Sequence, residues 1–330
     1  MSHHFARAAF LIAAAFFAPL SRADPPADAV RGPIHLSSQS PLQSLRLSLV
    51  PGIPLSGNSG ERHLSFSETW TNVWVDHPES AVLDYEAVDS RLSLGWSLGR
   101  GWSVTTTFEN RSLLGGRLDH TIQEFHEMVG LGLNGRDDVP RDSIHIAIRD
   151  PRSGKILFQA GKSASGSYET AVGATLARVV KFGSFDLDGS MTVRTNLGER
   201  LSPEKRGDID AGLTAGAYRK IGPAGLYAGV GFSRFAGASI GGLTLEKQQW
   251  TFLSAIELPA TERTSLIAQY LANQGLTTEG PLSKATNEAL LGFRHRSGSN
   301  VYEIGLIENV LRFDNGPDFG LHFAVHHLWD

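Results

Sequence analysis

Apolar and polar residues alternate with a period of two along much of the chain after Arg62. In residues 92–98, leucine and tryptophan alternate with small or polar residues, and 102–109, 185–194 and 318–329 repeat the pattern. Such alternation is typical of β-strands with one apolar face and one polar face. The pattern therefore predicts an all-β protein.

The lengths of these segments separate two kinds of β-protein. We expect strands at 62–76, 82–99, 101–112, 168–181, 184–195, 208–220, 224–235, 247–259, 262–273, 285–296, 299–309 and 318–329, and most are 10 to 15 residues long. Strands of ordinary sheets average about 5–6 residues, whereas tilted membrane strands need about 9–11. The lengths favour strands that cross a membrane.

The connections between the expected strands alternate between short turns and long loops. Short turns follow residues 99, 181, 221, 259 and 297, and the longest loop covers 113–167. Bacterial outer-membrane barrels have this asymmetry. The prediction is a transmembrane antiparallel β-barrel, most consistent with 12 strands, with 14 as the alternative. A soluble β-sandwich also alternates, but its strands are shorter.

The first 23 residues have the composition of a secretory signal peptide. A short start with Arg7 precedes an apolar run, and Ser21-Arg22-Ala23 offers small residues for cleavage. Residues 24–60 are rich in Pro, Ser and Gly and are expected in the lumen or in the periplasm. Residues 61–330 are the expected barrel domain.

Charge and cysteine content exclude several classes of protein. The chain has no cysteine, which excludes a disulfide framework and an N-terminal lipid anchor. Without residues 1–23 it has 28 basic and 34 acidic residues, a net charge of −6. We therefore expect no nucleic-acid partner.

Aromatic residues are expected in belts at the two membrane interfaces. The candidates are Trp96 and Trp102 beside a short turn, and Trp74, Trp250 and Tyr270 near long loops. The last strand ends at Trp329, and a terminal aromatic residue is what the barrel assembly machinery reads. We expect outer-membrane lipid and this machinery as partners.

Charged residues recur on the polar face of the expected strands. They are Arg91, Glu109, Arg111, Asp186, Asp188, Arg194, Glu257, Glu288, Arg294, Glu303 and His322. Both signs are present, so these residues are expected either to fill a narrow barrel with salt bridges or to line a polar pore.

The stretch 123–142 interrupts the strand pattern. A capping box at Thr121–Glu124 predicts a short helix from Ile122 to Gly130 in the loop between strands three and four. The expected lid or gate residues are Ile122, Phe125, His126, Val129, Arg136, Asp137, Asp138 and Arg141. His126 is the single candidate for catalysis. No metal-binding or nucleophile motif is present, so no metal and no cofactor is predicted.

Three parts of the sequence resemble a known bacterial family. The central part consists of residues 125–126, 130–131, 135–136 and 140–141. The N-terminal part consists of 31–33 and 39–42, and the C-terminal part of 304–309 and 317–322. They are similar to the signatures of the family catalogued as domain of unknown function 3187. The chain departs from that pattern at Val129 and Gly132. The resemblance implies an outer-membrane-like barrel and implies no activity.

Three functions are compatible with such a barrel. The leading hypothesis is a passive channel or uptake protein for an unidentified small solute in the outer membrane of a Gram-negative bacterium. The rival is a membrane-embedded lipid hydrolase of the phospholipase or lipid A deacylase type, which needs an activated nucleophile near a histidine at the lipid-facing rim. The third is a structural barrel without transport. No enzymatic activity is assigned.

The signal peptide and the strand pattern together predict where the protein is found. The mature protein should fractionate with the outer membrane and should migrate faster on a gel when unheated than when boiled, because a folded barrel resists detergent. Recovery as a soluble periplasmic protein with one gel mobility would contradict a barrel.

Overall fold

The computed structural model of the chain describes residues 31–52, 61–116, 143–199, 207–237, 239–240, 242–278, 280–311 and 315–329. The expected signal peptide at 1–23 and the expected lid helix at 122–130 lie outside these residues. So do all eight lid or gate residues, Ile122, Phe125, His126, Val129, Arg136, Asp137, Asp138 and Arg141.

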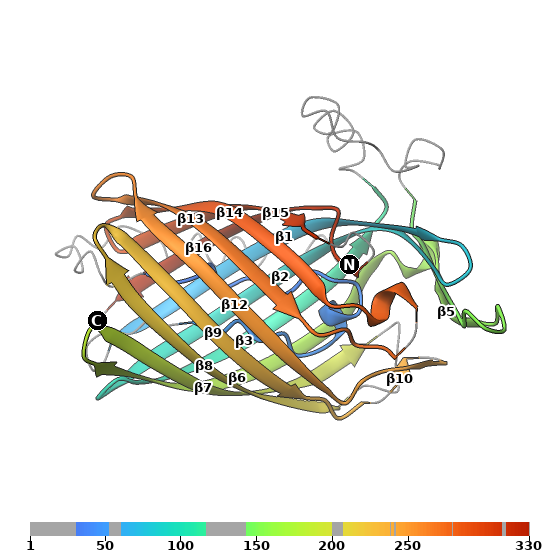
Figure 1. The fold of residues 1–330 in the computed structure, drawn as a ribbon, viewed down its shortest axis with the longest axis horizontal. Helices are drawn as coiled ribbons and strands as arrows, with labels where there is room; N and C mark the ends of the chain where they lie inside the picture. Colours follow the sequence, from blue (N-terminus) through green and yellow to red (C-terminus); the bar gives the residue numbers. More distant parts are fainter. Residues whose placement is uncertain are drawn as a thin grey trace.

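The described residues form an almost purely β structure (Figure 1). The strands are β1 (Arg62–His77), β2 (Ala81–Gly99), β3 (Trp102–Leu114), β4 (His145–Arg149), β5 (Ile156–Ala160), β6 (Gly166–Phe182), β7 (Phe185–Glu199), β8 (Ile209–Ile221), β9 (Ala224–Arg234), β10 (Ser239–Ile240), β11 (Leu243–Thr244), β12 (Gln248–Pro259), β13 (Thr264–Asn273), β14 (Thr286–Ser297), β15 (Asn300–Asn309) and β16 (Phe319–Trp329). The helical elements among the described residues are the single-turn 3-10 helices η2 (Gln43–Leu45), η4 (Lys162–Ala164) and η6 (Pro281–Ser283). None of the described helices is long and apolar enough to span a membrane.

The main sheet closes on itself to form a barrel. It has 14 strands, of which β4 and β5 lie outside the closed wall, so twelve strands remain. Closure comes from β1, which pairs antiparallel with both β2 and β16; Arg62 lies opposite Trp96 on one side and opposite Trp329 on the other. The predicted twelve-stranded antiparallel barrel is confirmed, and most predicted strand ends agree within a few residues.

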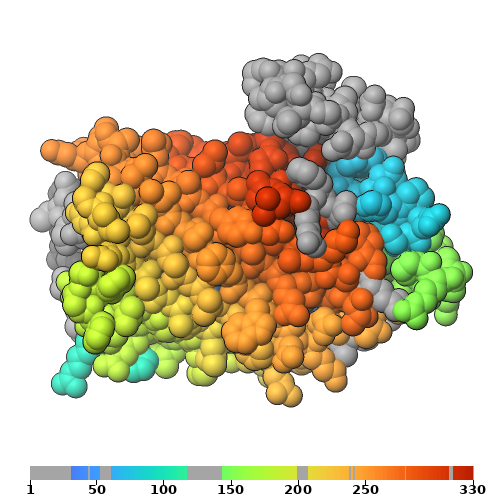
Figure 2. Space-filling model, in the orientation of Figure 1, coloured from blue at the N-terminus to red at the C-terminus, as the bar shows by residue number. Residues whose placement is uncertain are grey.

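The alternating sequence pattern produces the two faces of this wall. Phe108, Met191 and Leu213 point outward and are 41%, 52% and 57% exposed. Their polar neighbours in sequence, such as Thr107, Thr192 and Thr214, line the interior. Figure 2 shows one side of the wall as a continuous surface of side chains from β7 to β14. A lipid bilayer would cover the outer apolar side chains, as in other membrane barrels.

Tight turns connect the strands at one end of the barrel, where the C-terminus also lies (Figure 1). Gly183, Gly222 and Gly298 take positive φ angles of 60°, 57° and 59° in three of these turns. Glycine adopts this left-handed conformation readily, because it has no Cβ atom that would clash with the backbone. The glycine positions thus explain why the chain reverses within so few residues.

The opposite end carries the longer connections and an additional hairpin. Strand β2 continues beyond the end of β3, and Ala81–Asp84 pair there with β4. Strands β4 and β5 form this hairpin within the long connection between β3 and β6.

The aromatic residues expected at the membrane interfaces differ in exposure, and their place in aromatic belts stays a prediction. Trp250 is 58% exposed and Trp102 37% exposed, but Trp74 is only 8% exposed. Trp74 pairs with Asp84 in the part of the β1–β2 hairpin that continues past the end of β3. It therefore lies above the closed wall instead of on its outer surface.

An apolar cluster fills the interior of the long-loop end. Its members include Leu42, Leu45, Leu47 and Leu49 of the N-terminal segment, Val73 and Val75 of β1, Leu83 and Tyr85 of β2, Ile146 and Ile148 of β4, and Leu243 of β11. We call this group the apolar cap. Burying such a side chain contributes roughly 1.5–3 kcal/mol, so the cap holds these connections together across one mouth of the barrel.

The orientation of the wall predicts different costs for two neighbouring positions in β7. Met191→Arg should destabilise the barrel by about 2–4 kcal/mol, because it places a charge in the lipid near mid-wall. Thr192→Arg should cost much less, because this side chain faces the polar interior. Denaturant titration of both variants in lipid vesicles measures the difference; equal costs would mean that the strand is shifted by one residue.

Candidate functional site

The barrel interior contains two clusters of ionised side chains. The first cluster lies on β2, β3, β6 and β7 and consists of Asp89, Glu109, Arg111, Glu169 and Arg194. Arg194 Nε donates to Glu109 Oε2 at 3.0 Å and Arg111 Nε to Asp89 Oδ1 at 2.5 Å. Both arginines also pair with Glu169. All five side chains extend from one half of the wall toward the lumen.

The second cluster lies on the opposite half of the wall, on β12, β14 and β15. Arg294 Nη1 donates to Glu257 at 2.9 Å, and its Nε donates to Glu303, the residue opposite it on β15, at 2.6 Å. His326 of β16 extends this cluster, with Nε2 at 3.2 Å from Glu303 and Nδ1 at 2.8 Å from the Ser65 hydroxyl. Removing one partner from such a buried pair costs about 3–5 kcal/mol, because an uncompensated charge remains.

Residues 31–52 run through the lumen beside these clusters; we call them the lumen segment. At its start, Arg31 pairs with Asp186 and stacks over Tyr218 at 4.5 Å. Gly32 donates its N–H to Glu257 at 3.2 Å and accepts from Arg294 Nη2 at 2.9 Å. This end of the segment is therefore attached to charges on the wall.

The middle of the lumen segment is attached to a wall carboxylate and to backbone carbonyls of the connecting loops. Ser38 and Gln39 donate to Glu288, with 3.0 Å from the Gln39 N–H to Oε2. After η2, Arg46 donates to the carbonyls of Glu246 and Gly237 at 2.6 and 2.5 Å. Burial lowers the pKa of Arg46 to about 10, which leaves it charged at neutral pH.

The chain then turns back alongside itself. The Leu47 N–H donates to Asp210 at 3.0 Å, and Gly52 returns to Pro33. A Cβ at Gly229 would come within 2.6 Å of Pro51, so glycine in the wall permits this close approach. The lumen segment thus folds back on itself inside the barrel and acts as a plug. Hydrogen bonds with side chains hold it in place, and it takes no part in the strand pairing of the barrel.

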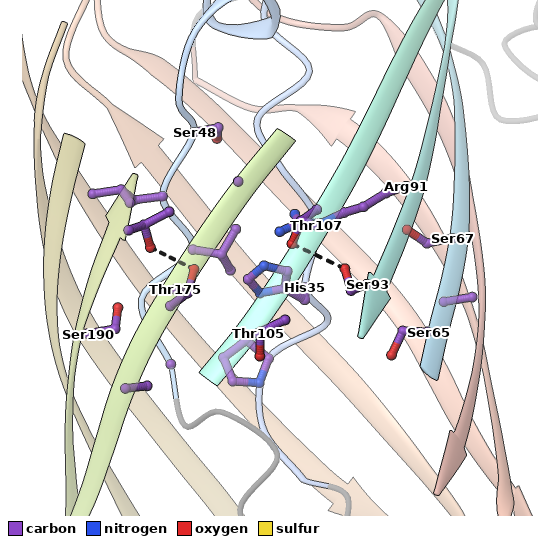
Figure 3. Close-up of a pocket in the computed structure, with 18 of the residues that line it drawn as sticks. His35, Ser48, Ser65, Ser67, Arg91, Ser93, Thr105, Thr107, Thr175 and Ser190 are labelled. Carbon is purple, nitrogen blue, oxygen red and sulfur yellow. Dashed lines mark hydrogen bonds between the residues drawn. The ribbon is translucent and has the colours of Figure 1, made fainter. Parts of the chain in front are cut away.

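A cavity of about 180 Å³ remains between the lumen segment and the wall (Figure 3). Nine strand hydroxyls line it: Ser65, Ser67, Ser93, Thr105, Thr107, Thr175, Ser190, Thr192 and Thr214. The polar lining also includes Ser48, Arg31, Arg91, Glu109, Arg194, Arg294, Glu303 and the histidines His35, His63, His322 and His326. No group of three or more potential metal ligands is placed to hold an ion within the described ranges.

The structure places the predicted polar-face residues on the inside of the wall. Arg111, Asp186, Asp188, Arg194, Glu257, Glu288, Arg294, Glu303 and His322 are buried, and Arg91 and Glu109 line the cavity. Asp89, Glu169 and Asp210 were not predicted, although Asp89 shares the alternation of Arg91. The contacts of His35 and Arg46 carry no periodic signal, because the lumen segment contains no strand and its one helical element is the single turn η2.

Residues 11–329 match the family described as Protein of unknown function (DUF3187). The chain belongs to this family. Its barrel is similar to the crystal structure of the COG4313 outer membrane channel from Pseudomonas putida F1, with a TM-score of 0.52, 10% identity and coverage of 83% of this chain and 97% of that chain.

A second solved structure is more distant. The NanC porin has a TM-score of 0.46 and 8% identity, with coverage of 80% of this chain and 98% of that chain. No curated protein sequence matches the chain. For this member of the DUF3187 family, the similarity to the COG4313 channel shows the fold of an outer-membrane β-barrel.

The enclosure of His35 inside the barrel predicts that acid releases the lumen segment. Desolvation, together with the nearby charge of Arg91, lowers the pKa of His35 to about 3, whereas a histidine in water titrates near 6.5. Between these values the released segment binds more protons than the docked one, so docking weakens as pH falls, and the exposure of His35 to the cavity reduces the size of this effect. A nitroxide at Ser48→Cys should become more mobile from pH 7 to pH 4.

His35→Gln is the matched variant for this experiment. Arg91, Glu109, Glu303 and His326 act electrostatically on His35, and they remain in the variant. The mobile fraction should therefore increase less with acid in His35→Gln than in the parent. The same acid response in both proteins would assign the effect to those other groups.

Proposed function

We propose that this protein is a channel for small hydrophilic solutes in the outer membrane of a Gram-negative bacterium, and that the lumen segment is its gate. The observation that supports this most is the way residues 31–52 are held. Their N–H groups at Gly32, Gln39 and Leu47 donate to carboxylates of the wall. The segment can leave the lumen without breaking the backbone pairing of the barrel.

The composition of the interior supports transport better than a purely structural barrel. A wall needed only for stability can be filled with apolar or salt-bridged side chains. Here a cavity lined by nine hydroxyl groups of the strands remains beside the lumen segment. The similar COG4313 structure is named an outer membrane channel, which is consistent with the same role.

The rival hypothesis of a lipid hydrolase has weaker support. The contact among the described residues that most resembles a catalytic triad joins Ser65, His326 and Glu303. All three side chains line the inner cavity, away from the lipid that such an enzyme must reach. His126, the candidate from the sequence, lies outside the described residues, and its role as a lid residue stays a prediction.

Closure by the lumen segment can be tested with a reversible cross-link. A Cβ built at Gly231 lies 3.2 Å from the Leu49 Cβ, within a few tenths of an ångström of disulfide geometry. The natural chain has no cysteine, so Leu49→Cys with Gly231→Cys introduces a single pair. Openings in planar bilayers should be lost in the oxidised protein and should return with a reductant.

Two controls accompany this measurement. Each single-cysteine variant should conduct normally under both conditions, and the heat-dependent gel shift verifies that the double variant has folded. Equal conductance of the oxidised and reduced double variant would show that the lumen segment does not gate the pore.

A further inference from the structure

The cavity beside the lumen segment has the size of a binding site for a single small molecule. Its volume is about 180 Å³, and a cavity measured in this way needs only about 10–15 Å³ to hold one water molecule. The space can therefore hold many water molecules or one small solute. The lumen segment forms one side, through Pro33, His35 and Ser48, and strands of the barrel form the other.

Pairs of hydroxyl groups line the wall side of the cavity, between smaller side chains such as Ala177 and Ala324. Ser93 lies opposite Thr107, Thr175 opposite Thr192, and Ser190 opposite Thr214 in the strand register. Their oxygen atoms are 3.4, 2.9 and 2.6 Å apart, and Figure 3 shows the first of these pairs beside His35. Each hydroxyl can both donate and accept, which matches a ligand that also carries hydroxyl groups.

The ionised groups of the lining are already compensated. Arg31, Arg194 and Arg294 each contact at least one carboxylate, and Glu109 and Glu303 each contact an arginine. An anion or a cation entering the cavity would lose hydration without finding a free counter-charge, which is unfavourable in a buried site. A neutral solute does not carry this cost.

Arg91 is more weakly paired than the other arginines of the lining. Its Nη1 is 3.4 Å from the Ser37 hydroxyl and 3.8 Å from Glu109, and its side chain lines the cavity. A guanidinium group carries five N–H donors, so Arg91 can donate to a further oxygen. With Glu109 nearby, an uncharged oxygen, such as an alcohol oxygen, suits this position better than a second carboxylate.

We propose that the cavity binds a neutral polyhydroxylated solute of about the size of a monosaccharide or hexitol. The paired hydroxyls of β2, β3, β6, β7 and β8 exchange hydrogen bonds with the hydroxyls of the solute, and Arg91 donates to one of its oxygens. This site deepens the proposed channel function, since it names the class of solute that the lumen accepts.

Saturation-transfer NMR on the full mature protein in detergent micelles tests the site, with sorbitol as the neutral probe. Gluconate and protonated glucosamine are charged probes of similar size. Sorbitol should bind more tightly than both. Ser93→Ala with Thr107→Val should weaken sorbitol binding at least about fivefold, because hydrogen bonds to two hydroxyls are lost.

Thr106→Val is the matched control, because Thr106 neighbours Thr105 and Thr107 on β3 but its side chain is on the exposed outer face. It should leave binding unchanged. Tighter binding of gluconate or of glucosamine than of sorbitol would overturn the proposal, as would the absence of saturable sorbitol binding. Equal effects of the lumen and control variants would also overturn it.

Liposome-swelling measurements separate this site from the channel itself. Saturable sorbitol binding without sorbitol entry would support the site and contradict a channel. Solute entry without saturable binding would support the channel and contradict the site.

Discussion

A chain that crosses a bilayer as strands must pair every backbone N–H and C=O group within the wall, because lipid offers no partner. Closing twelve strands into a barrel meets this requirement, and it fixes the width of the lumen. About eight strands leave an interior that side chains fill, whereas sixteen or more leave an aqueous channel. The twelve-stranded wall lies between these cases, and here residues 31–52 occupy part of the space.

The carboxylates of the interior connect the lumen segment to the wall. Glu257 accepts from Arg294 at 2.9 Å, from the Tyr227 hydroxyl at 3.0 Å and from the Gly32 N–H at 3.2 Å. Because the arginine belongs to the wall, Glu257 keeps a counter-charge when the segment leaves. The same group can therefore hold the segment in the lumen and stay compensated after its release.

The apolar cap and the polar cavity divide the lumen into two regions. In the cap, Leu45 and Leu47 of the lumen segment pack with side chains from β1, β2 and β4. In the cavity, Pro33 and His35 face hydroxyl groups. Release of the segment would thus remove apolar contacts at one mouth and uncover the hydroxyl surface, so closure and solute access are coupled through one stretch of chain.

The wall could be predicted from the sequence because alternation identifies its two faces directly. Parity alone assigns Met191 to the outer face and Thr192 to the inner face, and it assigns both Arg194 and Glu303 to the inner face. Parity does not show that Arg194 contacts Glu109 from β3, since that depends on the register of strands distant in sequence. The alternation of apolar and polar residues also gives no information on where the lumen segment lies. The segment contains no strand, and each of its contacts depends on an individual residue.

Amide hydrogen exchange of the unmodified protein in lipid vesicles tests the central claim most directly, namely that residues 31–52 are docked in the lumen. The N–H groups of Gly32, Ser38, Gln39 and Leu47 all have hydrogen-bond acceptors. Peptides that cover them should exchange far more slowly than an unstructured chain. Exchange at the rate of an unstructured chain throughout 31–52 would contradict a docked segment and the gate derived from it.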